Sequence, residues 1–149
     1  MSLINFYRNN DSYGYLSNFS PYGFTLSDHF RPTVEHYFQA AKFLDQTVRL
    51  SILQTQSPME VTKIGRDRRN KLRDDWESIK DDVMRVAVFN KFSQNNEIGK
   101  LLLATNDAHL VEHTSNDAYW ADGGDGSGKN MLGLILMEAR ELLKIQMKN

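Results

Sequence analysis

The sequence predicts a mainly α-helical domain with short β-strands near its N-terminus. Apolar residues recur at helical spacing over most of the chain after Pro32, whereas the first 30 residues hold many aromatic residues separated by turn formers. At 149 residues, with 40% hydrophobic and 25% charged residues, the chain has the size of one compact unit. We therefore expect residues 1–149 to form a single domain.

The composition excludes several classes of protein. The chain has no cysteine, which rules out disulfide frameworks, thiolate metal sites and cysteine nucleophiles. Its 18 basic and 19 acidic residues nearly balance, so a charged partner must be met by a local cluster of charges. Neither a membrane-length apolar run nor a leader-like start is present, and we expect a cytoplasmic protein without a membrane partner.

Helix boundaries follow from capping residues and apolar spacing. Thr33 is a plausible N-cap for the first helix, and a capping box at residues 57–60 (SPME) starts the third, which Gly65 is expected to stop. The last helix is apolar around most of its first turns and is expected to form the core. The expected helices cover roughly residues 34–46, 48–54, 58–65, 76–87, 98–102 and 131–147.

The first helix carries a polar stripe. Glu35, Gln39, Lys42 and Gln46 recur at intervals that place a carboxylate, two amides and an ammonium on one side of a helix. Glu35 falls in the first turn, where the helix dipole favours an ionised carboxylate that can act as a base or stabilise a cation. An exposed ion-pair face accounts equally well for this stripe.

A basic segment and an aromatic, acidic loop are the next candidates. Residues 63–73, which include Arg66, hold six basic residues against one acidic residue, and arginines near a helix end bind phosphate well. Trp76 follows this segment and can stack on a planar base. Residues 117–124 (DAYWADGG) have the composition of a loop that closes on a sugar or aromatic ligand. A solvated charged loop and a core-anchoring tryptophan are the alternatives.

Two motifs resemble metal or nucleotide sites. Residues 109–113 (HLVEH) match the inverted zinc-hydrolase pattern, but the segment looks short and extended, so we expect no metal site. Residues 123–130 (GGDGSGKN) approach the P-loop pattern, although Asn130 stands where a magnesium-binding hydroxyl is needed. Lys129 and the glycine-rich backbone can still hold a phosphate, with Asn130 as the N-cap of the last helix.

Several motifs stand in an order that identifies a family. The sequence resembles the YbiA/NADAR family of N-glycosidases over nearly its whole length. The resemblance implies a YbiA-like, mainly helical fold and cofactor-free hydrolysis. The motifs are PTVEHYFQAAKF (32–43), SPMEV and GRDR (57–68), NDAYWADGG (116–124) and GKNMLGLILMEAR (128–140).

The resemblance also implies a substrate. Such proteins cleave the N-glycosidic bond of phosphorylated ribosylamino-pyrimidines, which are early intermediates of riboflavin synthesis. Some relatives instead remove ADP-ribose from guanine in nucleic acid, so ADP-ribosylated guanine in DNA or a nucleoside is the alternative substrate. A non-catalytic module that binds ADP-ribose is a third possibility.

Site residues are carried over from the matching motif positions. The resemblance gives functional roles to Glu35, Trp76 and Asp122. One departure is visible at Arg31, where the family usually has a tryptophan. Motif positions with less defined roles, mostly in substrate binding, are Asn18, Lys42, Arg66, Asp117, Trp120, Lys129 and Asn130.

The chemistry of C–N cleavage indicates which role each of these residues takes. Glu35 is expected to stabilise positive charge on the sugar or to activate water, and Asp122 or Asp117 to supply a proton to the base. Trp76 or Trp120 is expected to stack on the base. In a second route, Lys42 captures the sugar carbon as a Schiff base.

Overall fold

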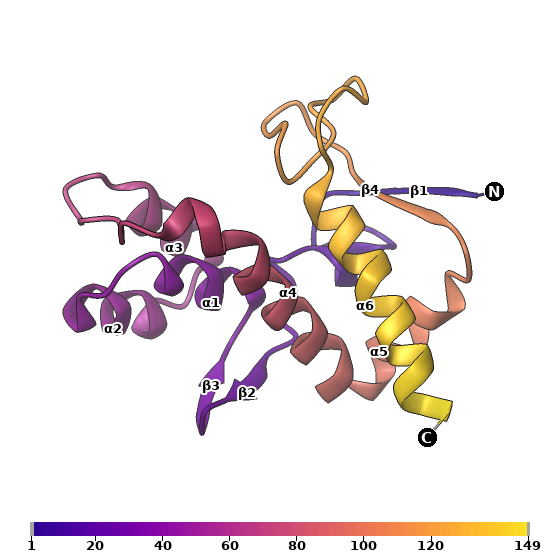
Figure 1. Ribbon diagram of the computed structural model, residues 1–149, viewed down its shortest axis with the longest axis horizontal. Coiled ribbons are helices and arrows are strands. Elements are labelled where there is room, and N and C mark those ends of the chain that lie inside the picture. Colours follow the sequence, from indigo (N-terminus) through magenta and orange to yellow (C-terminus); the bar gives the residue numbers. More distant parts are fainter. Residues whose placement is uncertain (1, 149) are drawn as a thin grey trace.

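The computed structural model describes residues 2–148 and confirms the mainly α-helical fold (Figure 1). Short strands near the N-terminus are also confirmed. The helices are α1 (Val34–Ala41), α2 (Gln46–Gln54), α3 (Pro58–Arg66), α4 (Trp76–Gln94), α5 (Asn96–Ala104) and α6 (Met131–Lys148). The strands are β1 (Leu3–Phe6), β2 (Phe24–Leu26), β3 (His29–Arg31) and β4 (His109–Glu112), with a 3-10 turn, η1, at Gly14–Leu16.

The long helix α4 lies in the middle of the molecule, with α1 on one side and α6 on the other (Figure 1). The main core forms around α4 and α6, which bury apolar residues such as Met84, Phe92, Leu132 and Leu136. A smaller apolar cluster joins α1, α2 and α3. Helix α6 is only partly a core helix, since Leu142, Ile145 and Met147 on its outer face are exposed.

Helix α1 is shorter than expected and ends at Ala41. Its last carbonyls are occupied from outside the helix, because the backbone amide of Arg73 donates to the carbonyl of Lys42 at 2.9 Å. The chain then turns, and Asp45 caps α2 through the amide of Thr47 at 2.9 Å. Gln46 therefore starts a new helix and does not belong to the polar stripe of α1.

Gly65 does not stop α3, which continues to Arg66. Its role is to permit close packing of α3 against α1. A Cβ atom at this position would lie 1.8 Å from Oε1 of Gln39. The missing side chain thus brings α3 close to the polar residues of α1.

The strands form two separate two-stranded sheets. β2 and β3 make an antiparallel hairpin, whereas β1 pairs in parallel with β4 from the far end of the sequence, with Phe6 opposite Glu112. The extended conformation expected for residues 109–113 is confirmed over His109–Glu112. Within residues 2–148, no group of three or more His, Asp or Glu side chains is placed to hold a metal ion. No helix in this range is long and apolar enough to cross a membrane.

Candidate active site

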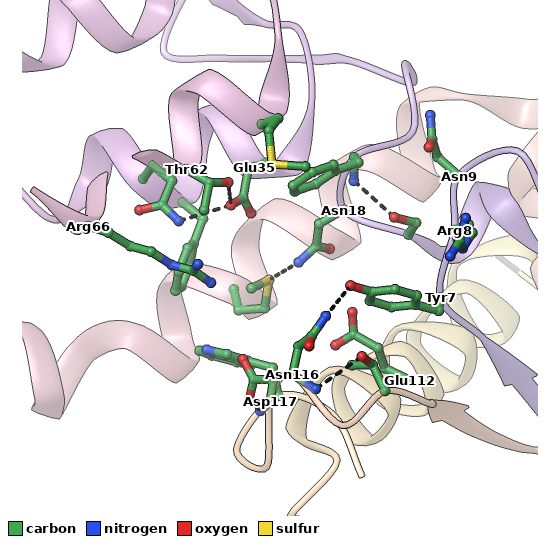
Figure 2. Close-up of a pocket in the computed structure, with 18 of the residues that line it drawn as sticks. Tyr7, Arg8, Asn9, Asn18, Glu35, Thr62, Arg66, Glu112, Asn116 and Asp117 are labelled. Atoms are coloured by element: carbon green, nitrogen blue, oxygen red, sulfur yellow. Dashed lines mark hydrogen bonds between the residues drawn. The ribbon is translucent and has the colours of Figure 1, made fainter. Parts of the chain in front are cut away.

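A pocket of about 740 Å³ opens between the α1–α3 group and the parallel sheet (Figure 2). One wall is formed by α1 and α3, and the opposite wall by the end of β4 and the loop that follows it. The segment after β1 and the turn before β2 close the remaining sides. The pocket therefore lies where segments from all parts of the sequence meet.

Glu35 is a carboxylate of the pocket that two neighbouring side chains hold in place. It sits in the first turn of α1, where Thr33 caps the helix through the amide of His36, and it is 7% exposed. Its Oε2 accepts hydrogen bonds from Thr62 Oγ1 at 2.5 Å and from Gln39 Nε2 at 2.9 Å. Within residues 2–148 no donor is bonded to Oε1, which leaves this oxygen for a ligand.

The polar stripe on α1 is therefore a buried support rather than an exposed ion-pair face. Glu35 and Gln39 are both buried, and their side chains bond to one another. The interpretation as a solvated face is wrong for these two positions. Thr62 on α3 completes the support; no sequence pattern singled it out, because its contact with Glu35 exists only once the two helices pack.

Two cationic side chains lie on the same wall as Glu35. Lys42 follows the last turn of α1, and its Nζ lies 5.6 Å from the ring centre of Phe38. Burial lowers the pKa of Lys42 to about 8; nearby Glu35 opposes this shift, whereas Arg68 and Arg66 add to it. Arg66, at the end of α3, lies along the same side of the pocket (Figure 2).

Arg66 is the residue of the basic segment 63–73 that lines this pocket. Four of its basic neighbours bond to other residues, and the fifth, Lys71, is exposed and does not line the pocket. Arg66 is therefore the basic residue of this segment that is available to a phosphate in the pocket, together with Lys42 of α1. The engaged residues are Lys63, paired with Glu60; Arg68, bonded to the carbonyl of Gly65; Arg69, paired with Asp67; and Arg73, paired with Asp75.

The loop after β4 supplies the tryptophan of the pocket, Trp120. Asp117 Oδ1 accepts hydrogen bonds at 2.8 Å from the amides of Tyr119 and Trp120, which shapes this loop. The Trp120 ring lines the pocket and packs edge-on against Phe38 at 5.3 Å between ring centres. Asn18 faces this region from the segment before β2 (Figure 2).

Glu112 is a pocket residue whose role the sequence did not indicate. It is the last residue of β4 and lies across the pocket from Glu35, with Asn18 between them (Figure 2). Burial raises the pKa of Glu112 to about 7, and the negative charges of Asp117, Glu35 and Asp122 add to the effect. In the sequence Glu112 appears in a zinc-like motif and among the acidic residues of 107–130. Neither feature places it in the pocket, because the strand pairing that does so is not a local feature.

The comparisons with known proteins agree with this architecture. A family model described as the NADAR domain matches residues 5–144. The chain belongs to the NADAR domain family. It is 53% identical to N-glycosidase YbiA of Escherichia coli strain K12 over 145 residues, covering 97% of this chain and 91% of that protein. It is 42% identical to a riboflavin biosynthesis protein of Vibrio vulnificus over 141 residues, covering 95% of this chain and 38% of that protein.

The fold is shared as well. The NMR structure of the E. coli protein YbiA matches with a TM-score of 0.92 and 52% sequence identity, covering 99% of this chain and 88% of that one. The resemblance drawn from the motifs is thus confirmed. The residues that it singled out in this NADAR domain nevertheless separate into two groups. Those that line the pocket are Asn18, Glu35, Lys42, Arg66, Asp117 and Trp120.

Trp76 lies behind the pocket wall and does not line it. It begins α4, is 5% exposed, and packs edge-on against Phe38 at 5.0 Å between ring centres. Its place in this NADAR domain is that of a core residue beneath the wall, so Trp120 is the tryptophan available to a base. Arg31 is also buried outside the pocket, with its guanidinium 5.4 Å from the Tyr37 ring centre.

Asp122 faces away from this pocket and organises the loop instead. It accepts hydrogen bonds from His113 Nδ1 at 2.7 Å and from the amides of Thr114 and Gly124 at 3.1 and 2.8 Å. The bond from His113, together with these amides, holds the pKa of Asp122 below its usual range. A carboxylate engaged in this way is poorly suited to donate a proton.

Lys129 and Asn130 line a second, open hollow of about 540 Å³ that also contains Asp122. The ammonium of Lys129 lies 5.3 Å from the ring centre of Tyr119. The side chain of Asn130 does not cap α6 as expected, because it is turned toward β4. Its Oδ1 accepts from the amide of Glu112 at 3.0 Å, and its Nδ2 donates to the carbonyl of Leu110 at 2.9 Å.

Proposed function

We propose that this NADAR domain hydrolyses the N-glycosidic bond between a phosphorylated ribose and a pyrimidine base in riboflavin-pathway intermediates. The products are ribose 5-phosphate and the free aminopyrimidine. The observation that carries the proposal is the fixed Glu35 carboxylate beside two cationic side chains in one pocket. The printed names of two relatives, an N-glycosidase and a riboflavin biosynthesis protein, support the same chemistry.

Glu35 is the group that responds to the positive charge on the sugar ring during the reaction, either by stabilising it or by activating water. Breaking a ribosyl C–N bond builds positive charge on the sugar ring, and a nearby carboxylate stabilises that charge or takes a proton from the attacking water. Thr62 and Gln39 hold Oε2, so the side chain stays in position while Oε1 meets the sugar. This preorganisation means that little rearrangement is needed at the moment of reaction.

The remaining pocket residues match three groups of the substrate: the phosphate, the pyrimidine and the sugar hydroxyls. Arg66 and Lys42 are placed to bind the phosphate, since a guanidinium offers paired donors to phosphate oxygens. Trp120, on the opposite wall, offers an aromatic face or edge to the pyrimidine. Asn18 lies between these walls, where its amide group is within reach of sugar hydroxyls.

Lys42 supports a second route in which its amine attacks the sugar carbon. The pKa lowered to about 8 raises the fraction of neutral amine near neutral pH, which is the nucleophilic form. This second route predicts that borohydride added during turnover leaves a ribose-phosphate adduct on Lys42, detected by mass spectrometry. Lys42→Arg keeps the charge but removes the amine, so on this route it should form no adduct and lose about 10²-fold in turnover.

The control for this prediction is Lys63→Arg, because Lys63 is exposed and paired with Glu60 outside the pocket. This variant should behave as the wild-type protein in both measurements. Turnover by Lys42→Arg at the wild-type rate, with no adduct on the wild-type protein, would exclude the covalent route. Lys42 would then act only as a cation beside the phosphate.

The proposed function is tested directly by product formation. A ribosylaminopyrimidine 5′-phosphate and an ADP-ribosylated guanosine are incubated separately with the protein, and released sugar phosphate or ADP-ribose is measured. We expect release of ribose 5-phosphate from the first substrate. Cleavage of the second substrate alone would assign the domain to removal of ADP-ribose from guanine, and tight binding without cleavage would make it a binding module.

A further inference from the structure

Three carboxyl groups line the pocket within residues 2–148, and they differ in how they are bonded. Glu35 accepts from two side chains, and Asp117 accepts from two backbone amides. The carboxyl group of Glu112 has no hydrogen-bond or ion-pair partner in this part of the chain. Glu112 is thus the pocket carboxyl that is open to proton exchange with a ligand.

The backbone of Glu112 is held rigidly even though its side chain is free. Its amide donates to Asn130 Oδ1 at 3.0 Å, and its carbonyl accepts from the amide of Asp122 at 2.9 Å. Asn130 is itself anchored by its bond to the carbonyl of Leu110. On the other edge of the strand, Glu112 is paired with Phe6 of β1. These contacts explain what Asn130 and Asp122 do: they position the end of β4.

The surroundings of Glu112 favour its protonated form. The negative charges that act on it are those of Asp117 on the following loop, Glu35 on α1 and Asp122 behind the strand. The basic residues that line the same pocket are Arg8, Lys42 and Arg66. The side chain of Glu112 is half-buried at the pocket wall. Two carboxyl groups in one pocket with different surroundings are the usual arrangement of an acid paired with a base or charge stabiliser.

We infer that Glu112 is the catalytic residue that donates a proton to the leaving nitrogen during C–N cleavage. The inference rests on the proposed function and names its general acid. Asn130 is a positioning residue in this scheme, because it acts on the reaction through the backbone of Glu112.

The step balances as a hydrolysis. The electron pair of the C–N bond goes to the nitrogen, which takes the proton of Glu112 and leaves as the amino group of the pyrimidine. Water adds its hydroxyl to the sugar carbon from the side of Glu35, which takes the remaining proton. Exchange with solvent then returns a proton to Glu112 and removes one from Glu35.

The first test is the pH profile of Glu112→Gln. Since the acid must be protonated and burial raises its pKa to about 7, kcat/KM of the wild-type protein should fall as pH rises through about 7. In Glu112→Gln, kcat/KM should no longer fall as pH rises through about 7, and at lower pH turnover should be about 10- to 100-fold slower than in the wild-type protein. Glu112→Asp retains a carboxyl group, so its kcat/KM should still fall at alkaline pH. The matched control is Glu97→Gln, an exposed residue on α5.

The second test changes the leaving group. 4-Nitrophenyl ribofuranoside 5-phosphate releases a stable phenolate that needs no proton, so Glu112→Gln should cleave it at nearly the wild-type rate. Equal slowing on both substrates, or a wild-type rate on the ribosylaminopyrimidine, would overturn the inference while the proposed function stands. If the wild-type protein cleaved neither substrate, the proposed function would fail and the inference with it.

Discussion

Glu35→Gln should lower kcat/KM for the ribosylaminopyrimidine 5′-phosphate by about 10²-fold or more, the usual scale for losing a positioned charge stabiliser or base. Glutamine has nearly the same shape, and its carbonyl oxygen still accepts the hydrogen bonds from Thr62 and Gln39. The fold should therefore survive, and the effect should fall on the chemical step. The measurement is the rate of ribose 5-phosphate release, with thermal unfolding followed alongside.

The matched control for Glu35→Gln is Glu60→Gln. Glu60 also lies in the first turn of a helix, but its side chain is exposed and bonded to Lys63. The substitution Glu60→Gln should change kcat/KM by less than about twofold, since exposed ion pairs contribute little to the stability of the fold. If Glu35→Gln retained a rate close to that of the wild-type protein, the carboxylate would have no part in the mechanism.

Gly133→Ala should destabilise the protein by about 3 kcal/mol and reduce its activity as well. Gly133 lies in α6, where a Cβ atom would come within 2.1 Å of the carbonyl oxygen of Leu110 and 2.4 Å of Asn130 Nδ2. These atoms are backbone and a fixed amide, so α6 would have to move away from β4. The displacement of Asn130 would also release the backbone of Glu112.

The sign of the change in the free energy of unfolding of Gly133→Ala shows whether the steric clash is present. Alanine favours a helix interior over glycine by about 1 kcal/mol, so a substitution without a steric clash would stabilise α6. Denaturant unfolding of Gly133→Ala is compared with that of Ile145→Ala, which removes an exposed side chain from the same helix. The second variant should change the free energy of unfolding by less than about 0.5 kcal/mol. A stabilised Gly133→Ala protein would contradict the close contact between α6 and β4.

Local signals in the sequence predicted much of the helical framework. Thr33 and the capping box at residues 57–60 begin their helices as expected, because the side chains of Thr33 and Ser57 bond to amides only three residues away. The end of α1 was misjudged by several residues. Its termination depends on Arg73, which is distant in sequence and contacts the last carbonyls of the helix.

The candidate site was predicted only in part. Motif positions identified Glu35, Lys42 and Arg66, which all line the pocket. Asp122 was also singled out by its motif, yet its carboxylate is engaged by His113 and two amides. A motif position can hold a side chain that contacts the ligand or one that shapes the surrounding loop, and both roles give the same pattern in a sequence. Whether a carboxylate faces a ligand or its own loop depends on its neighbours in space.

The sequence by itself determined the helical class of the fold, the capped starts of α1 and α3, the family and the glutamate at the start of α1. The helical class and the helix starts depend on periodicity and on contacts within a few residues. The family follows from the resemblance of several ordered motifs, one of which contains this glutamate. The tertiary structure decided that Thr62 and Gln39 hold Glu35 and that Glu112 faces it across the pocket. Glu112 reaches that place through the parallel pairing of β1 with β4 and the packing of α6 on β4. Such contacts join distant segments, so their geometry exists only when the chain has folded.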